Sequence, residues 1–334
     1  MLSETKITIA VAAIGGNATL GVSIHEFLKA CLLNNVVEDE AFLTLDNSNI
    51  KTIIPARKKT VTVVFDESKK ANFDPRAHAN ASPSKIDSRY YKSHTLYEMR
   101  HIKEEHRSKL ATSKSENKDW WETAYKSRIY MIKNQKFSSP SVKFIGGYKS
   151  GIIWNLEKDL YMNQFCYRIY GSPTKYEEYK DLFWLVCSVD GKDPTEGSSV
   201  EGKISSGKRA SFSTEGNKSK SIIYMTLGQA KKKEEDLEKL KIQESERDKF
   251  VVYDWKKDWW EWSFEYRFQK DIKDETSAFP LSNKFKNIRN GWDEKIENDT
   301  SLNKVCKDFY ESDNSSSDEV EDAWRYCSDT GSRI

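Results

Sequence analysis

The sequence predicts a mainly α-helical protein in which a hydrophobic amino-terminal segment and a small β element precede two tandem copies of one helical module. The string KDWWE occurs at Lys118–Glu122 and again at Lys257–Glu261. Each string is followed by a pair of cysteines, and the spacing within the pair is the same in both copies, which indicates a diverged tandem duplication. A repeat of about 70 residues is large enough to bury a small core of its own.

Composition divides the chain into segments of different character. The 54 basic and 52 acidic side chains are interspersed, and no strongly basic tract occurs beyond the mixed run KKKEEDLEKLK. A nucleic-acid-binding protein concentrates positive charge on one face or segment, so we expect no nucleic-acid partner. The expected segments are a hydrophobic anchor (1–35), a small β meander with a loop and a charged helix (36–112), a first helical Trp/Cys module (113–188), a flexible linker with a second charged helix (189–250) and a second Trp/Cys module (251–334).

The amino-terminal segment has the length of a membrane anchor. Eighteen uncharged residues lie between Lys6 and His25. At a helical rise of about 1.5 Å per residue they cross most of a bilayer core of roughly 30 Å. A small-x-small cleavage site does not follow them, so we expect an uncleaved single-pass helix in the cell membrane, with the carboxy-terminal part outside. A buried strand followed by a glycine turn is the alternative for the same residues.

The same segment contains a glycine loop, Gly15–Gly21, whose spacing is that of a phosphate site. The Ser23 hydroxyl also fits a P-loop, but Val22 stands where a lysine must reach the β- and γ-phosphates. The run AIGGNATL resembles the opening glycine loop of carbamate kinases. A soluble phosphoryl-transfer enzyme that uses this loop is therefore an alternative function.

Residues 36–112 combine β and helical signals. Residues 89–112 predict a charged helix that carries His101 and His106, the one metal-like pair in the sequence. Histidines five residues apart lie about 140° out of line on a helix, so we predict no metal site and no cofactor. Three short β-branched runs predict a small antiparallel meander, at 41–45, 50–54 and 60–65.

The first helix of each copy is predicted to begin at KDWWE. Asp119 and Asp258 then lie near the positive end of the helix dipole, and each tryptophan pair presents one apolar and one interfacial edge. Tryptophans at matched positions are expected to fill the cores, since each buries on the order of 150–250 Å². This repeat signature comprises Trp120, Trp121, Trp154, Trp184, Trp259, Trp260, Trp292 and Trp324, with Trp154 matched to Trp292.

Two further helices are predicted in each copy. In the first copy the second helix runs from Trp154 to Tyr170, and Gly171 ends it. The third helix opens at Thr174-x-x-Glu177 in the first copy and at Ser316-x-x-Glu319 in the second. Both patterns fit a capping box.

The cysteines leave two interpretations open. One is a disulfide in each repeat, Cys166 to Cys187 and Cys306 to Cys327, which suits a protein outside the cell. A plain antiparallel helical hairpin would leave the partners about 12 Å apart, so a disulfide requires crossed helices. The other interpretation is four small buried thiols packed beside the tryptophans.

Between the repeats the composition changes abruptly. Residues 189–221 are rich in Gly, Ser and Lys and predict a flexible linker. Residues 229–249 predict a charged helix whose apolar stripe is too thin to anchor a core.

The carboxy-terminal spacing W…L…C…Y…W…C carries a family resemblance. Together with the glycine- and alanine-rich amino-terminal segment, it resembles the lineage-specific paralogous proteins of haemotrophic mycoplasmas. The resemblance implies an anchored or surface protein that interacts with a host or varies under host immunity. The usual member resembles a single repeat, so the duplication and the β segment are departures. The matching positions are Trp292, Leu302, Cys306, Tyr310, Trp324 and Cys327, with Trp154, Leu160, Cys166, Tyr170, Trp184 and Cys187 as the inner copy.

These observations predict a membrane-anchored tandem-repeat protein on the cell surface that acts by binding a protein partner, of the host or otherwise, and not by catalysis. Its two aromatic modules on a flexible connection suit a binder that engages partners twice. Besides the phosphoryl-transfer enzyme, a cytosolic repeat scaffold in which the apolar segment is core remains an alternative.

Overall fold

The computed structural model describes residues 70–76, 82–86, 99–151, 153, 155–156, 159–197, 202–213, 219–273 and 281–332. The expected membrane anchor (1–35), the Gly15–Gly21 loop and the predicted β meander lie outside these residues. Among the helices of the described part, none combines the length and the apolar character that a membrane crossing requires.

The described chain is a mixed α and β fold, so the prediction of a mainly α-helical fold holds only in part. An antiparallel sheet of order β1-β4-β5 joins Ala71–Phe73, Gly207–Ser213 and Ser219–Tyr224. The stretch 189–221, expected to be a flexible linker, therefore contributes to a β-hairpin. The many Gly and Ser residues made the alternation of a β-strand difficult to recognise in the sequence. In the strand, Ala210 is buried against the core while Arg209 is exposed.

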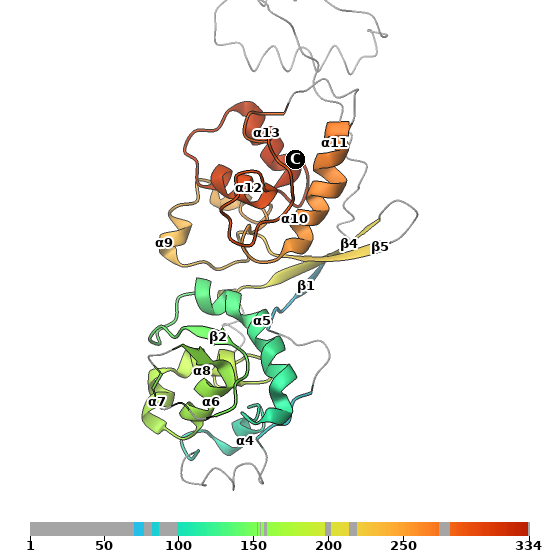
Figure 1. The fold of residues 1–334 in the computed structure, drawn as a ribbon. Helices are drawn as coiled ribbons and strands as arrows, with labels where there is room; N and C mark the ends of the chain where they lie inside the picture. The colour runs from blue at the N-terminus through green and yellow to red at the C-terminus, as the bar shows by residue number, and fades with distance from the viewer. Residues whose placement is uncertain are drawn as a thin grey trace, which may run out of the picture. The chain divides into compact units, whose positions relative to one another are not determined.

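Two modules of the same architecture make up most of the described chain. We define module one as residues 99–191 and module two as residues 239–331. Figure 1 shows α6, α7 and α8 gathered in module one, and α10, α12 and α13 in module two. Module one contains α4 (Glu104–Arg107), η2 (Ser115–Asn117), α5 (Lys118–Asn134), the parallel pair β2 (Phe144–Gly146) and β3 (Leu160–Tyr161), α6 (Met162–Tyr170), α7 (Pro173–Glu178) and α8 (Lys180–Cys187). Module two contains η4 (Glu244–Glu246), α10 (Lys257–Ser263), the π-helix η5 (Phe264–Phe268), α11 (Gln269–Lys273), α12 (Leu302–Tyr310) and α13 (Ser317–Tyr326), and α9 (Glu234–Leu237) lies just ahead of it.

The repeat begins earlier than the KDWWE strings. Arg107 Nε donates to the Ile102 carbonyl at 2.9 Å, and Arg247 Nε donates to the Ile242 carbonyl at 3.3 Å. The two pairs are separated along the chain by the same offset as the matched cysteines. The same turn therefore opens both modules.

The two charged helices predicted at 89–112 and 229–249 are wrong in their described parts. Only the short turns α4, α9 and η4 form there. Leu240 and Ile242 are buried in the core of module two and do not belong to a solvated spacer. The Lys241 N–H, which lies between them, donates to the Tyr310 carbonyl at 2.7 Å, so tertiary contacts replace the helical hydrogen bonds.

The first helices begin where the sequence predicts. α5 starts at Lys118 and α10 at Lys257. The prediction of one interfacial tryptophan edge is wrong, because both tryptophans of each KDWWE string are buried. An arginine about two turns further along the chain supplies a charged partner inside the core for one ring of each pair.

The second helices begin later than predicted. α6 starts at Met162 and not at Trp154, because β3 and the loop ahead of it occupy the preceding residues. Met162, and not Leu160, is thus the counterpart of Leu302, the first residue of α12. Trp292 lies in a loop, and Trp154 lies outside the described residues.

Two asparagines establish the register of the loop before each second helix. Asn163 accepts from the N–H of Lys149 at 3.0 Å and donates to its carbonyl at 3.0 Å. Asn303 makes the same two bonds to Asp293, at 2.9 and 2.9 Å. Lys149 and Asp293 are therefore equivalent, so the counterpart of Trp292 is the residue before Lys149, Tyr148, and not Trp154.

The third helices differ in how they begin. The capping box at Ser316 and Glu319 is confirmed, with the Glu319 N–H donating to Ser316 Oγ at 3.3 Å. In module one the cap is Ser172 and not Thr174, because Pro173 occupies the first helical turn. Module one also divides this segment into α7 and α8 at Tyr179.

Candidate functional site

A disulfide joins the second and third helical segments of each module. The bonds are Cys166–Cys187 and Cys306–Cys327, with Cα atoms 5.6 and 5.8 Å apart. A plain antiparallel hairpin would separate these Cα atoms by about 12 Å. The helical segments therefore converge at the cysteines, which are fully buried. Each bond therefore joins the second helix of its module covalently to the end of the third.

A buried arginine lies at the end of the disulfide-bonded helix in module one. Arg128 Nη1 donates to the carbonyls of Leu185, Val186 and Ser188 at 2.9, 3.1 and 2.8 Å. Its Nη2 donates to the carbonyl of Val189 at 2.9 Å. These are carbonyls that the end of a helix leaves without helical partners, and a cation is favourable at that end of the helix dipole.

Arg267 takes the same role in module two. Its Nη1 donates to the Ser328 carbonyl at 2.6 Å and its Nη2 to the Asp329 carbonyl at 2.9 Å. The two guanidinium groups lie over the rings of Trp120 and Trp259, at 5.4 and 5.0 Å from the ring centroids. Burial lowers the pKa of Arg128 to about 9 and that of Arg267 to about 10, which leaves both charged at neutral pH.

A second pair of identical side chains attaches the segment ahead of each first helix. The indole N–H of Trp121 donates to the Thr112 carbonyl at 3.0 Å, and that of Trp260 to the Val252 carbonyl at 3.0 Å. The Tyr170 hydroxyl donates to the carbonyl of the residue before Thr112, at 2.7 Å. The Tyr310 hydroxyl does the same in module two, at 2.9 Å. Each bond satisfies a buried main-chain carbonyl.

Each module ends in the same Cys-Ser-x-x-Gly turn. Gly191 and Gly331 have φ angles of 73° and 69°, a left-handed conformation that glycine adopts at no steric cost. The serine of each turn, Ser188 or Ser328, donates from Oγ to the carbonyl of the tryptophan four residues before it.

The predicted tryptophan signature is largely part of the two cores, as expected. Trp292 is half-buried, and Trp154 lies outside the described residues. The buried members are Trp120, Trp121, Trp184, Trp259, Trp260 and Trp324.

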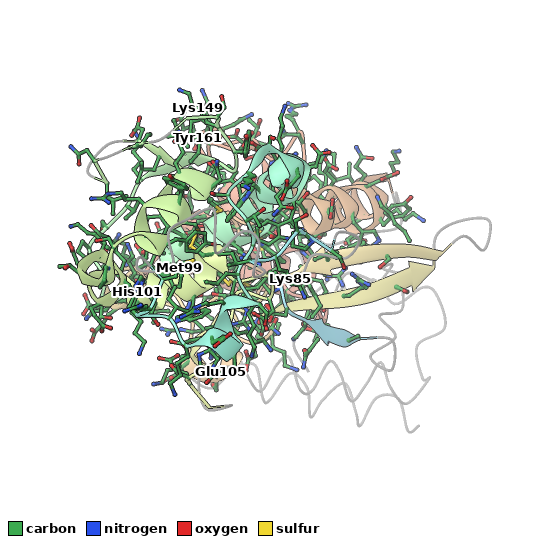
Figure 2. The ribbon with its side chains drawn as sticks, turned by 90° about the horizontal axis from the view of Figure 1, so that it is seen from below. Lys85, Met99, His101, Glu105, Lys149 and Tyr161 are labelled. Carbon is green, nitrogen blue, oxygen red and sulfur yellow. A yellow bond between two sulfur atoms is a disulfide. The ribbon has the colours of Figure 1, made fainter. Side chains whose placement is uncertain are left out.

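The two histidines of the metal-like pair face different partners. His101 packs against the Tyr176 ring at 5.1 Å between centroids, and His106 packs edge-on against Trp184 at 6.2 Å. Burial lowers the pKa of His101. Within the described residues, no group of three or more His, Cys, Asp or Glu side chains is placed to hold a metal ion. Figure 2 shows His101 apart from Glu105.

Several shared residues were not recognised from the sequence alone. They occur as identical pairs at nearly the same offset as the KDWWE strings, a signal visible in the sequence once those strings and the cysteines have been aligned. They are Ile102 and Ile242, Arg128 and Arg267, Gly147 and Gly291, Asn163 and Asn303, and Gly191 and Gly331. All of them are buried.

Comparisons with protein-family models, curated proteins and solved structures found no match to this chain. The internal comparison of the two modules is therefore the source of functional information. The shared polar side chains bond to main-chain atoms of their own module, whereas the surfaces differ. In Figure 2 the exposed Lys149 lies beside Tyr161, with its ammonium 5.5 Å from the ring centroid. Module two has Asp293 and Ser301 at the equivalent positions.

Proposed function

We propose that this protein is a binding protein displayed on the cell surface, in which two disulfide-stabilised modules present different faces to their partners and the 1–35 segment holds the chain to the membrane. The observation that carries this proposal is the contrast between interior and surface. The buried arginine, asparagine and cysteine pairs are identical in the two modules, while exposed positions such as Lys126 and Glu265 have diverged.

This pattern is expected of a scaffold that supports variable recognition. A reaction common to both copies would require the same reactive groups at equivalent accessible positions. The polar pairs that are shared instead bond to the main chain of their own module, as with Arg128 to Ser188 and Arg267 to Ser328. Divergent surfaces on one scaffold suit the recognition of different partners.

The disulfides favour a position outside the cytosol. Disulfides persist in oxidising compartments and are rare where thiols are kept reduced. Both modules have one at the same place, so each would keep its fold when exposed at the surface. This agrees with the anchored or surface protein that the resemblance to the haemotrophic mycoplasma proteins implies.

Surface display can be tested on intact cells. A membrane-impermeant amine reagent should label exposed lysines such as Lys126 and Lys149 without lysis, while a cytosolic marker protein stays unlabelled. Added protease should likewise remove both modules. A chain that is labelled only after lysis would instead support the cytosolic repeat scaffold. A phosphoryl-transfer activity lost on substitution of Asn17 would support the enzyme built on the Gly15–Gly21 loop.

A further inference from the structure

The two modules have opposite net charges on one fold. Module one contains 16 basic and 11 acidic side chains, which give a net charge of +5 with histidine neutral. Module two contains 16 basic and 22 acidic side chains, which give −6. The number of basic residues is the same, so the whole difference comes from acidic residues.

Three equivalent positions reverse their charge between the modules. The first lies two residues before the buried arginine, on α5 in module one and on the π-helix η5 in module two. The second is the residue whose main-chain N–H and carbonyl bond to Asn163 or Asn303. The third lies two residues after the first cysteine. The pairs are Lys126 and Glu265, Lys149 and Asp293, and Arg168 and Asp308.

Of these six side chains, Arg168 and Asp293 are half-buried, and the Asp293 carboxylate accepts from the N–H groups of Glu297 and Asn298 at 2.7 and 2.9 Å. The other four reach the solvent. Lys126, Lys149 and Glu265 are exposed, and the Asp308 side chain is 43% exposed. Within one chain, a contact between the two modules involves other residues: the Tyr130 hydroxyl of module one donates to Asp254 of module two at 3.1 Å. Lys126, Lys149 and Glu265 thus remain on the surface of the modules.

We propose that module one of one copy of the chain binds module two of a second copy, head to tail, through side chains at these positions of reversed charge. Because the two modules share one fold, equivalent positions carry opposite charges, and opposite charges across an interface direct association. A head-to-tail contact uses two different surfaces, so it builds a ring or an open series and not a two-fold dimer. This inference names the partner in the proposed binding function and rests on it.

Salt provides the first test. The purified full-length chain in mild detergent, followed by sedimentation velocity, should form assemblies larger than a dimer at about 0.05 M salt. These should dissociate at about 1 M salt, where the Debye length is about 3 Å. A chain that is monomeric at both salt concentrations overturns the proposal, and so does a salt-insensitive assembly. Neither result bears on surface labelling of cells, so the two proposals can fail separately.

Charge reversal provides the second test. The triple variant Lys126→Glu, Lys149→Asp and Arg168→Asp gives module one acidic residues where module two already has them, so the fold should tolerate the change. We expect its dissociation constant to rise about tenfold or more. Adding Glu265→Lys and Asp308→Arg in the same chain should restore association, because the complementarity returns with the signs exchanged. Asp293 is left unchanged, since its carboxylate accepts main-chain N–H groups of its own loop.

A matched control separates these positions from the net charge alone. Lys103→Glu, Lys109→Glu and Lys118→Glu change the net charge of module one by the same amount at other exposed sites. Association of this control should weaken less than that of the first triple variant. Equal losses would overturn the assignment to the reversed positions, as would a combined five-residue variant that stays monomeric although its circular dichroism is unchanged.

Discussion

Arg128 and Arg267 occupy the same buried position in the two modules, and each donates to the main-chain carbonyls that follow the disulfide-bonded helix of its module. Each guanidinium also lies over the first tryptophan of a KDWWE string. One side chain thus connects α5 in module one, or the π-helix η5 in module two, to the end of the third helix. This connection explains why both copies contain a buried cation, although its removal from water costs free energy.

Replacing this arginine should unfold its module first. We expect Arg128→Met to lower the free energy of unfolding by about 2–5 kcal/mol, since several buried carbonyls lose their donors. Arg128→Lys should recover little, because an ammonium cannot span the same set of carbonyls. Urea unfolding measures both changes. Lys126→Met, exposed on the same helix, should stay within about 0.5 kcal/mol of the unmodified chain, and an equal loss there would contradict the assigned role.

The two disulfides determine how many free thiols the chain should contain. Before reduction, alkylation of the denatured chain followed by mass spectrometry should modify one cysteine, Cys31; after reduction it should modify all five. Replacing Cys306 and Cys327 together by alanine should destabilise module two by about 2–5 kcal/mol. Cys31→Ser is the control and should not change the unfolding midpoint. Five thiols before reduction would favour the alternative of packed, unbonded cysteines.

Gly147 and Gly291 should not accept a side chain. A Cβ at either position would collide with the backbone carbonyl of Trp121 or Trp260 on the first helix. Gly147→Ala should therefore cost about 1–3 kcal/mol, measured by thermal unfolding, because the loop must move away from the helix. At Gly197 a Cβ meets open space, so Gly197→Ala should be close to neutral.

Module one should be sensitive to acid through His101. Burial lowers the pKa of this side chain in the folded state, so the folded module favours neutral imidazole. Its stability is then greatest above the unfolded pKa of about 6.5 and falls as the pH decreases from there towards the lower folded value. Hydrogen exchange of α6 amides should report this loss, and His101→Gln should remove it. Module two, with Lys241 at the equivalent position, serves as the internal reference.

The amino-terminal segment predicts behaviour in fractionation. If residues 1–35 span the bilayer, the full chain should stay with membranes after washing with high salt and at alkaline pH, because a spanning helix is not held by screenable charge. Recovery of the intact chain in the soluble fraction would contradict the anchor and, with it, the surface display.

Some local structure followed directly from residue types. The KDWWE helices and the Ser316 capping box were predicted correctly, since they depend on contacts within one helical turn. The start of the second helix was not, because a parallel strand pair with Phe144 competes for Leu160. The cap of α7 was displaced to Ser172, because the nearby proline determines the first turn.

In the candidate site too, some features could be predicted from the sequence and others could not. Identical cysteines at one offset suggested disulfides but left thiols open, because the spacing alone does not say whether two helices converge. The equivalence of Lys149 and Asp293 could not be found from a tryptophan alignment. This equivalence follows from the same two main-chain bonds that Asn163 and Asn303 make.

By itself, the sequence determined that this protein contains a duplicated aromatic and cysteine-bearing module, because identical buried residues persist at fixed offsets while the rest diverges. Only the tertiary structure decided where each module begins, which carbonyls its arginine satisfies and which surface positions are equivalent. The physical reason is range: helix starts and caps depend on neighbours along the chain, whereas the bonds from Arg128 to Ser188 and from Arg267 to Ser328 join residues about 60 positions apart. Such contacts exist only once the chain has folded around them.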